Sequence, residues 1–240
     1  MTSAWIRQFH TGRADSARLV CFPHAGGSAS YYFAVSRALA PDVDVLAVQY
    51  PGRQDRRHEP CVTDLHVLAD LVTEELTPYG DRPLTFFGHS MGASLAFEVA
   101  RRLPVPITGL FVSGRSAPTC PRDDRMHLAD DHRLIDGLGR MSGTDAAVLG
   151  DEEILRLILP ALRGDYQAAE TYRYRPGPPL SCPVTALIGD RDDQVTEAEA
   201  KPWAERTTGP FHLHIFDGGH FYLNDHAPAV ITLLRDHLAA

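Results

Sequence analysis

The chain has 240 residues, of which 44% are hydrophobic and 22% charged, so it can bury a sizeable core in one domain, with room for one inserted subdomain. Its formal net charge of -8 argues against nucleic acid as the main partner, because contacts to phosphates need clustered Lys and Arg. No apolar run approaches the ~20 residues of a membrane helix, and the amino terminus lacks a signal-peptide pattern. We therefore expect a cytoplasmic protein with no membrane attachment.

Short runs rich in β-branched and aromatic residues alternate along the chain with longer amphipathic runs. This alternation is typical of a parallel sheet covered by helices on both faces, that is, of the α/β class. Several expected strands are almost wholly apolar, as strands buried on both faces should be. The expected strands are 18–22, 43–49, 84–88, 109–113, 184–189 and 212–217, and the expected helices are 29–39, 64–79, 91–103, 197–207 and 229–239.

Residues 115–179 interrupt this alternation. The segment begins with a turn-forming, charged stretch, continues through helical pieces such as 152–162, and ends on Pro-Gly-Pro-Pro at 176–179. We expect an insertion that stands over the carboxyl edge of the sheet and acts as a lid, on a core made of residues 1–114 and 180–240. The alternative is a peripheral layer of packed helices with no gating role.

The most informative motif is Gly-His-Ser-Met-Gly at positions 88–92, which follows an apolar strand and leads directly into a helix. This is the context of the nucleophile elbow in α/β-hydrolases. Gly88 and Gly92 leave room for the sharp turn, and the start of the helix favours developing negative charge. The motif predicts that Ser90 is a catalytic nucleophile, with an ordinary helix-capping serine as the alternative.

A serine hydroxyl needs a base, and that base needs an orienting acid. Chain order in the elbow family is nucleophile, acid, histidine. His220 follows the last expected strand in a loop opened by two glycines, so we expect it to be the base. Two candidate acids, Asp190 and Asp192, follow the strand 184–189. The Gly-x-x-Asp pattern usual in hydrolases of this kind selects Asp192, and Asp190 is the second choice. His89 adjoins the nucleophile, but neighbouring side chains in a tight turn point apart, so it is expected to be structural or to line the pocket.

The first expected strand ends in Pro-His-Ala-Gly-Gly at 23–27. A turn of small residues can bring a backbone N–H close to a ligand oxygen, where side chains would obstruct the approach. The second donor of such an oxyanion hole should be the residue after the nucleophile. We expect the backbone N–H groups of Ala25 and Met91 to form the hole, and a simple tight turn is the alternative.

With these pieces placed, the sequence resembles the type II thioesterases that accompany polyketide synthases and nonribosomal peptide synthetases. The matching stretches follow the family's order over most of the chain, whereas the expected lid carries little that can be matched. These stretches are Phe-Pro-His-Ala-Gly-Gly at 22–27, Tyr-Tyr-Phe at 31–33, Gln-Tyr-Pro-Gly-Arg at 49–53, Gly-His-Ser-Met-Gly-Ala at 88–93, Gly-Asp-Arg-Asp at 189–192 and Gly-Gly-His-Phe-Tyr at 218–222.

The resemblance implies an editing enzyme that removes misprimed or stalled acyl groups from the phosphopantetheine arm of acyl or peptidyl carrier proteins. No metal or bound cofactor is called for. His24, His89, Arg53 and Phe221 are expected to shape the substrate site, and a monomer is the default expectation. Two other functions stay open: a carboxylesterase or lipase acting on small oxygen esters, and a non-catalytic module that binds an acyl chain or a partner.

Overall fold

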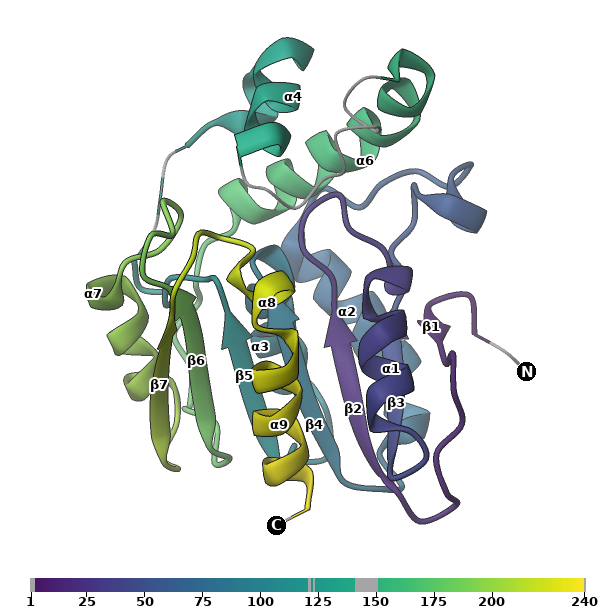
Figure 1. Cartoon of the computed structure of the whole chain (residues 1–240), viewed down its shortest axis with the longest axis vertical. Coiled ribbons are helices and arrows are strands. Elements are labelled where there is room, and N and C mark those ends of the chain that lie inside the picture. The colour runs from purple at the N-terminus through teal and green to yellow at the C-terminus, as the bar shows by residue number, and fades with distance from the viewer. Residues whose placement is uncertain (1–2, 121, 123, 141–150, 240) are drawn as a thin grey trace.

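A single mixed sheet forms the centre of the protein (Figure 1). The computed structural model describes residues 3–120, 122, 124–140 and 151–239, and within them seven strands pair in the order β1-β3-β2-β4-β5-β6-β7. Strands β2 to β7 pair with one another in parallel, as the apolar runs predicted. The strands are β1 (Ile6–Arg7), β2 (Ala17–Phe22), β3 (Val43–Val48), β4 (Leu84–His89), β5 (Gly109–Ser113), β6 (Val184–Gly189) and β7 (Phe211–Phe216).

Strand β1 was not predicted. It pairs antiparallel with the edge strand β3, with Ile6 opposite Val48 and Arg7 opposite Ala47. A strand of two residues is too short to show a period-2 pattern, so the sequence carries no signal for it. Strand β7 lies at the opposite edge, and its mixture of half-buried and exposed residues reflects that position.

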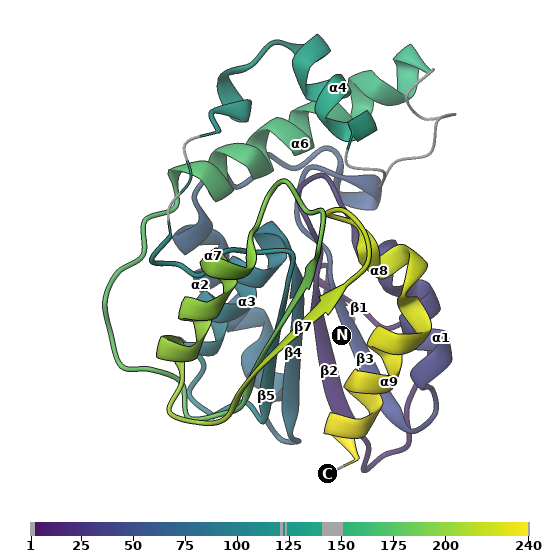
Figure 2. The ribbon, with the colours of Figure 1, turned by 60° about the vertical axis from the view of Figure 1, so that its left-hand side comes forward.

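Helices cover both faces of the sheet (Figure 2). Helices α2, α3 and α7 lie on one face, whereas α1, α8 and α9 lie on the other. Every residue of α3 is buried, because it packs between the sheet and α2. The bounds are α1 (Phe33–Leu39), α2 (Leu65–Leu76), α3 (Met91–Ala100), α7 (Glu197–Ala200), α8 (Tyr222–Asp225) and α9 (Ala227–Leu238).

The helix expected at 197–207 is α-helical only in α7 and continues as a 3-10 helix over Lys201–Arg206. Pro202 explains the change, because it has no N–H to donate to the carbonyl four residues earlier. Elsewhere the strands and helices α2, α3 and α9 agree with the predicted ranges to within three residues. The helix expected at 29–39 begins as a 3-10 helix over Ala29–Tyr32, and the helical piece expected at 152–162 extends to Thr171.

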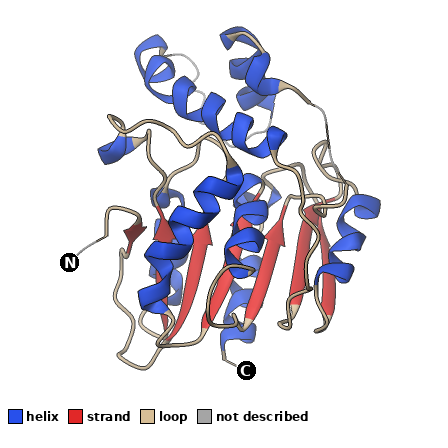
Figure 3. Ribbon diagram, turned by 180° about the vertical axis from the view of Figure 1, so that it is seen from behind, coloured by secondary structure: helices blue, strands red, loops and turns tan. Residues whose placement is uncertain are grey.

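Two further helices, α4 (Asp131–Arg140) and α6 (Glu152–Thr171), stand above the ends of the strands where the arrowheads point (Figures 1 and 3). Both come from the segment predicted to form an insertion at this edge. A small apolar cluster joins them, with Leu134 packing against Leu155, Leu159 and Leu162. In the part of the chain that the structure describes, no helix combines the length and apolar character needed to cross a bilayer.

Candidate active site

Ser90 stands at a strained turn between β4 and α3. Its backbone has φ 55° and ψ -121°, a region that residues with a side chain seldom occupy. A Cβ on Gly88 would lie 2.2 Å from the carbonyl oxygen of Gly92, and a Cβ on Gly92 would lie 2.1 Å from that of Phe22. Only glycine fits at both positions, so the two flanking glycines of the motif are steric requirements of this turn.

His220 and Asp192 meet at the carboxyl ends of β7 and β6. The His220 Nδ1 lies 2.9 Å from Asp192 Oδ2 and 3.1 Å from Oδ1, and both residues are buried. Asp192 Oδ1 also accepts a hydrogen bond of 2.8 Å from the backbone N–H of Gln194, which fixes the carboxylate. Asp190, the second candidate for the acid, is exposed and instead accepts from the backbone N–H of Gly218 at 2.8 Å.

Ser90 and His220 line the same cavity, which has a volume of about 270 Å³. The Ser90 hydroxyl and the His220 ring, both within the described residues, form no hydrogen bond with each other. Such bonds are often long before substrate binds and tighten in the complex. His220 can approach Ser90 through Nε2, since its Nδ1 is engaged by Asp192.

The backbone N–H groups of Ala25 and Met91 border this cavity and have no acceptor within the described residues. The Met91 N–H belongs to the first turn of α3, where intrahelical acceptors are missing. A Cβ on Gly92 would also lie within 2.6 Å of the Pro23 carbonyl oxygen, so the start of α3 packs directly on the loop after β2. Two free donors thus border the cavity beside Ser90.

The loop after β2 is held from behind by a buried ion pair. Arg53 Nη1 lies 2.6 Å from Asp165 Oδ2, and Arg53 Nη2 lies 2.8 Å from Oδ1. Asp165 Oδ2 also accepts from the backbone N–H of Gly26 at 2.8 Å, while Arg53 Nη1 donates to the Gly27 carbonyl at 3.0 Å. Arg53 was expected near the substrate, but it does not line the cavity. It instead ties the loop to α6.

His24 and Phe221, two other predicted substrate-site residues, do line the cavity. Their rings contact each other, with centroids 4.9 Å apart. His89 lies behind them, fully buried, and its ring centroid is 4.8 Å from that of His220. His89 Nδ1 is 2.9 Å from the Ser113 hydroxyl, so the ring that packs against His220 is itself held in place.

Two of these histidines are held in the neutral form. Burial, together with the charge that His220 can carry, lowers the pKa of His24 to about 3 and that of His89 well below its ordinary value. Neither His24 Nδ1 nor His89 Nε2 has a hydrogen-bond partner among the described residues. Both rings therefore stay uncharged near neutral pH.

Sequence analysis missed the far wall of the cavity. Asp165 and the lining residues of α4 and α6 lie in the stretch that carried no recognisable motif. Arg115 did have a signal, because it lies two residues after the buried strand β5, which pairs with β4, the strand before Ser90. Other lining residues from this region are Asp124, Met126, Arg133, Gly137, Tyr166, Ala169 and Glu170.

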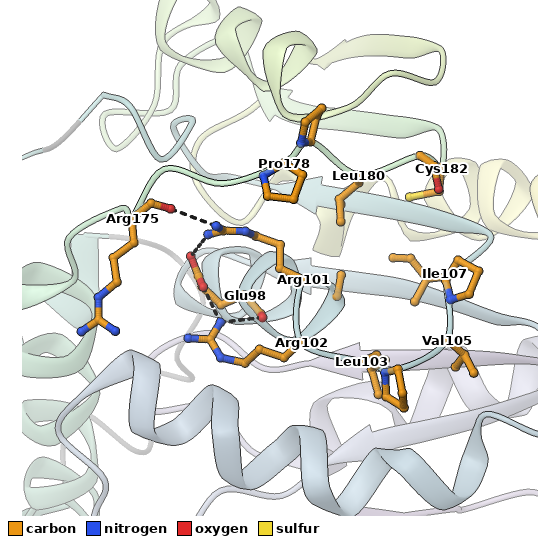
Figure 4. Close-up of a pocket in the computed structure, with 15 residues that line it drawn as sticks. Glu98, Arg101, Arg102, Leu103, Val105, Ile107, Arg175, Pro178, Leu180 and Cys182 are labelled. Atoms are coloured by element: carbon orange, nitrogen blue, oxygen red, sulfur yellow. Dashed lines mark hydrogen bonds and ion pairs between the residues drawn. The ribbon is translucent and has the colours of Figure 1, made fainter.

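A larger cavity of about 550 Å³ lies elsewhere (Figure 4). It is lined by the end of α3 and by the segments that precede β5 and β6, so it is at the opposite edge of the sheet from Ser90. Glu98 accepts hydrogen bonds there from Arg101, at 3.0 Å, and from Arg102 (Figure 4). No nucleophile–base pair occurs among its described lining residues.

Known proteins resemble this chain over almost its whole length. Residues 17–238 match the family model described as Thioesterase domain. The solved type II thioesterase BorB, from the borrelidin biosynthetic cluster, is 50% identical, with a TM-score of 0.94 and 99% of each chain covered. The chain belongs to the type II thioesterases of the thioesterase family. The α/β-hydrolase fold and the family predicted from the sequence are thereby confirmed.

Several other relatives of this type II thioesterase come from Streptomyces. The RedJ thioesterase of the prodiginine pathway in Streptomyces coelicolor has 35% identity and a TM-score of 0.89, over 95% of this chain and 93% of that one. The thioesterase PikA5 of Streptomyces venezuelae is 51% identical over 98% of this chain and 85% of its own length. The "Probable cadicidin biosynthesis thioesterase" of Streptomyces griseus is 54% identical over 98% of this chain. Our chain spans 66% of that relative's length.

Proposed function

We propose that this thioesterase hydrolyses acyl thioesters with Ser90 as nucleophile, His220 as general base and Asp192 as the acid that orients it. The observation that carries the proposal is the shared cavity of Ser90 and His220, with the Asp192 carboxylate 2.9 Å behind the imidazole. The carboxylate holds the proton on Nδ1, so Nε2 is left with a lone pair to accept a proton from the serine.

The reaction then has two halves. Ser90 Oγ attacks the thioester carbonyl carbon, its proton passes to His220 Nε2, and the oxyanion accepts hydrogen bonds from the N–H groups of Ala25 and Met91. The C–S bond breaks, and His220 returns the proton to the leaving thiolate. Water next gives a proton to His220 as it attacks the acyl-serine carbonyl carbon. The bond from that carbon to Ser90 Oγ breaks, His220 returns the proton to Oγ, and the acid is released. The protein's own groups supply each step, so the mechanism calls for no metal or cofactor.

The substrates we propose are acyl groups on the phosphopantetheine arm of acyl or peptidyl carrier proteins. This is supported by the relatives, whose names tie them to pathways such as yersiniabactin and gramicidin S biosynthesis. The task would be editing, in which aberrant acyl groups are removed and the carrier thiol is restored. We further propose that the protein acts as a monomer in the cytoplasm, and that residues 115–179 form a lid on a core of residues 1–114 and 180–240.

The test is to incubate the protein with an acyl-loaded carrier protein and, separately, with the matched oxygen ester, and to follow release of acid and of free carrier thiol. We expect faster release from the thioester. A preference for the oxygen ester would instead indicate a carboxylesterase, and inertness towards both a binding module.

Ser90→Ala is the matched variant. It removes one oxygen atom at a turn whose shape is set by glycines, so it should fold normally. We expect near-complete loss of turnover with an unchanged circular dichroism spectrum. Full activity in this variant would eliminate the proposed nucleophile.

A further inference from the structure

Three buried side chains form a hydrogen-bond chain beside the base. The Ser113 hydroxyl lies 2.9 Å from Nδ1 of His89 and 2.6 Å from the hydroxyl of Tyr222. His89 is the last residue of β4 and Ser113 the last of β5, and the two lie opposite each other in the pairing of these strands. Tyr222 begins α8, two residues after His220. The chain therefore connects the strand before the nucleophile to the segment that carries the base.

Ser113 also contacts the backbone of the nucleophile. Its carbonyl oxygen accepts a hydrogen bond of 2.8 Å from the N–H of Ser90. Because Ser90 has a positive φ, this bond helps to hold a turn that is strained. One residue thus binds the nucleophile's turn through its carbonyl and the chain beside the base through its hydroxyl.

The His89 ring packs against the imidazole of the base. The two ring centroids are 4.8 Å apart, and the ring planes are inclined by 39°. Both rings meet at Gly114, where a Cβ would lie 2.7 Å from Cε1 of His89 and 3.1 Å from Cε1 of His220. Gly114 also has a φ of 58°, so a side chain at this position would be both strained and obstructed. A glycine here lets the two imidazoles come together.

The number of donors in the chain fixes its direction. Burial raises the pKa of Tyr222 and holds that of His89 well below its ordinary value, so the phenol keeps its proton and the imidazole is neutral near neutral pH. Among the described residues, the Tyr222 hydroxyl contacts only Ser113, and the Ser113 hydroxyl contacts only these two side chains. Every proton of the chain finds an acceptor only if Tyr222 donates to Ser113 and Ser113 donates to His89 Nδ1. The Ser113 hydroxyl is therefore the donor that orients the His89 ring.

The direction of Nε2 in His220 is set by contacts other than the nucleophile. Within the described residues, the Ser90 hydroxyl forms no hydrogen bond with the His220 ring. Asp192 holds Nδ1, and the rings of His89 and Phe221 pack on the imidazole, with the shorter centroid distance to His89. A misplacement of 1 Å in an active site can cost about 100-fold in rate, so the position of the His89 ring matters for catalysis.

We propose that Ser113 is a positioning residue, whose hydroxyl holds the His89 ring against the base so that Nε2 of His220 points towards Ser90. Neither Ser113 nor His89 is among the described residues that line the cavity, so both act through His220 and not on the substrate. Tyr222 supports them, because its hydroxyl fixes that of Ser113. The inference rests on the proposed function and adds a residue to it.

Ser113→Ala removes the central hydroxyl and adds no atoms. We expect kcat on the acyl-loaded carrier protein to fall about 10- to 100-fold because the base is misplaced, while KM keeps its wild-type value. The second-order rate constant for inactivation by phenylmethanesulfonyl fluoride should fall by a similar factor. This small reagent reacts with an activated serine and has no carrier protein attached, so its rate reports how well His220 activates Ser90.

Tyr222→Phe tests the outer part of the chain. The ring still stacks on Phe216, with centroids 5.0 Å apart in the wild type, and the bond from Ser113 to His89 remains. We expect kcat to fall about 2- to 10-fold, the equivalent of one neutral hydrogen bond. The double variant Ser113→Ala/Tyr222→Phe should be no slower than Ser113→Ala, because the Tyr222 hydroxyl acts only through Ser113.

Thr85→Val is the matched control, because it removes a buried hydroxyl from the other end of the same strand pair. Thr85 Oγ1 lies 2.9 Å from the hydroxyl of Thr108, which directly precedes β5. Along β4 this position is about 16 Å before Ser90. We expect Thr85→Val and Ser113→Ala both to unfold at lower urea concentration than the wild type, and only Ser113→Ala to lose turnover and reactivity.

Wild-type kcat and wild-type inactivation in Ser113→Ala, or a loss confined to KM, would overturn the inference and leave the proposed function standing. If Ser113→Ala does not fold, Tyr222→Phe decides in its place, and a wild-type rate in that variant would then overturn the inference. Failure of the wild-type protein both to hydrolyse the thioester and to react with the sulfonyl fluoride would overturn the proposed function itself.

Discussion

The Nδ1 atom of His220 lies 2.9 Å from Oδ2 of Asp192, although a second aspartate, Asp190, stands only two residues away on the same loop. Only Asp192 contacts the imidazole, because its side chain is buried, whereas Asp190 is exposed and accepts a hydrogen bond from the backbone of Gly218. One carboxylate orients the imidazole, and the other shapes the loop that carries it.

This difference predicts unequal effects of two matched variants. Asp192→Asn should lower kcat by about 10⁴-fold, since an amide at this position favours the wrong histidine tautomer. Asp190→Asn should lower kcat by less than about 10-fold, because the Gly218 N–H can still donate to the amide oxygen. Steady-state kinetics on one acyl thioester measures both. The opposite ranking would move the acid to Asp190.

A second prediction concerns the turn at the nucleophile. A Cβ on Gly92 would lie 2.1 Å from the Phe22 carbonyl oxygen, so Gly92→Ala must push the start of α3 away from β2. We expect Gly92→Ala to lower the free energy of unfolding by about 3 kcal/mol, at the upper end of overpacking effects, and to abolish turnover.

Gly219→Ala serves as the control for this change. The atom nearest to a new Cβ on Gly219 would be the Arg191 carbonyl oxygen, at 3.9 Å, which is an ordinary contact. Urea unfolding should give Gly219→Ala nearly wild-type stability. Equal stability of the two variants would show that the close approach of α3 to β2 is not needed.

The buried pair of Arg53 and Asp165 leads to a third prediction. Asp165→Asn leaves the Arg53 cation buried without its carboxylate and weakens the hydrogen bond that fixes Gly26. Removing one partner of a buried ion pair costs about 3–5 kcal/mol, so we expect a loss of this order in urea unfolding. Turnover should also fall, because the loop bearing the Ala25 N–H loses its anchor.

Asp131→Asn is the matched control for Asp165→Asn. Asp131 pairs with Arg163, a residue of the same helix as Asp165, but in this pair the carboxylate is exposed and the guanidinium only half-buried. Exposed pairs contribute about 0–1 kcal/mol, so little change is expected. If Asp165→Asn were as stable and active as Asp131→Asn, the ion pair would have no role in holding the loop.

How far the sequence predicts this site depends on what kind of residue is involved. The sequence points to Ser90 and His220 because Ser90 lies between two glycines that the turn requires and His220 follows two glycines after a strand, and their catalytic roles stay predictions. Asp165 could not be found in this way, since it lies in the middle of an amphipathic helix and its partner is 112 residues away. The same contact explains why Arg53 was misplaced: a cation in a loop gives no local sign of whether it faces substrate or a buried carboxylate.

The last prediction follows from the neutral histidines beside the base. Burial holds the pKa of His89 well below its ordinary value and that of His24 near 3, so in the folded state each ring binds a proton only at a pH well below that of an ordinary histidine. In the unfolded chain both bind one below about pH 6.5. The contribution of these two neutral histidines to the free energy of unfolding should therefore be complete above that pH and should decrease as the solution is acidified. Each histidine contributes a slope of about 1 kcal/mol per pH unit between pH 6 and 5.

His89→Gln removes one of these groups while keeping a side chain that can hydrogen-bond the Ser113 hydroxyl. The decrease in the free energy of unfolding from pH 6 to pH 5 should be smaller in this variant by about 1 kcal/mol. His58→Gln, at an exposed position, is the control and should reproduce the wild-type slope. Urea unfolding at the two pH values measures all three proteins. Parallel slopes for wild type and His89→Gln would mean that His89 is protonated in the folded protein, which its packing against His220 opposes.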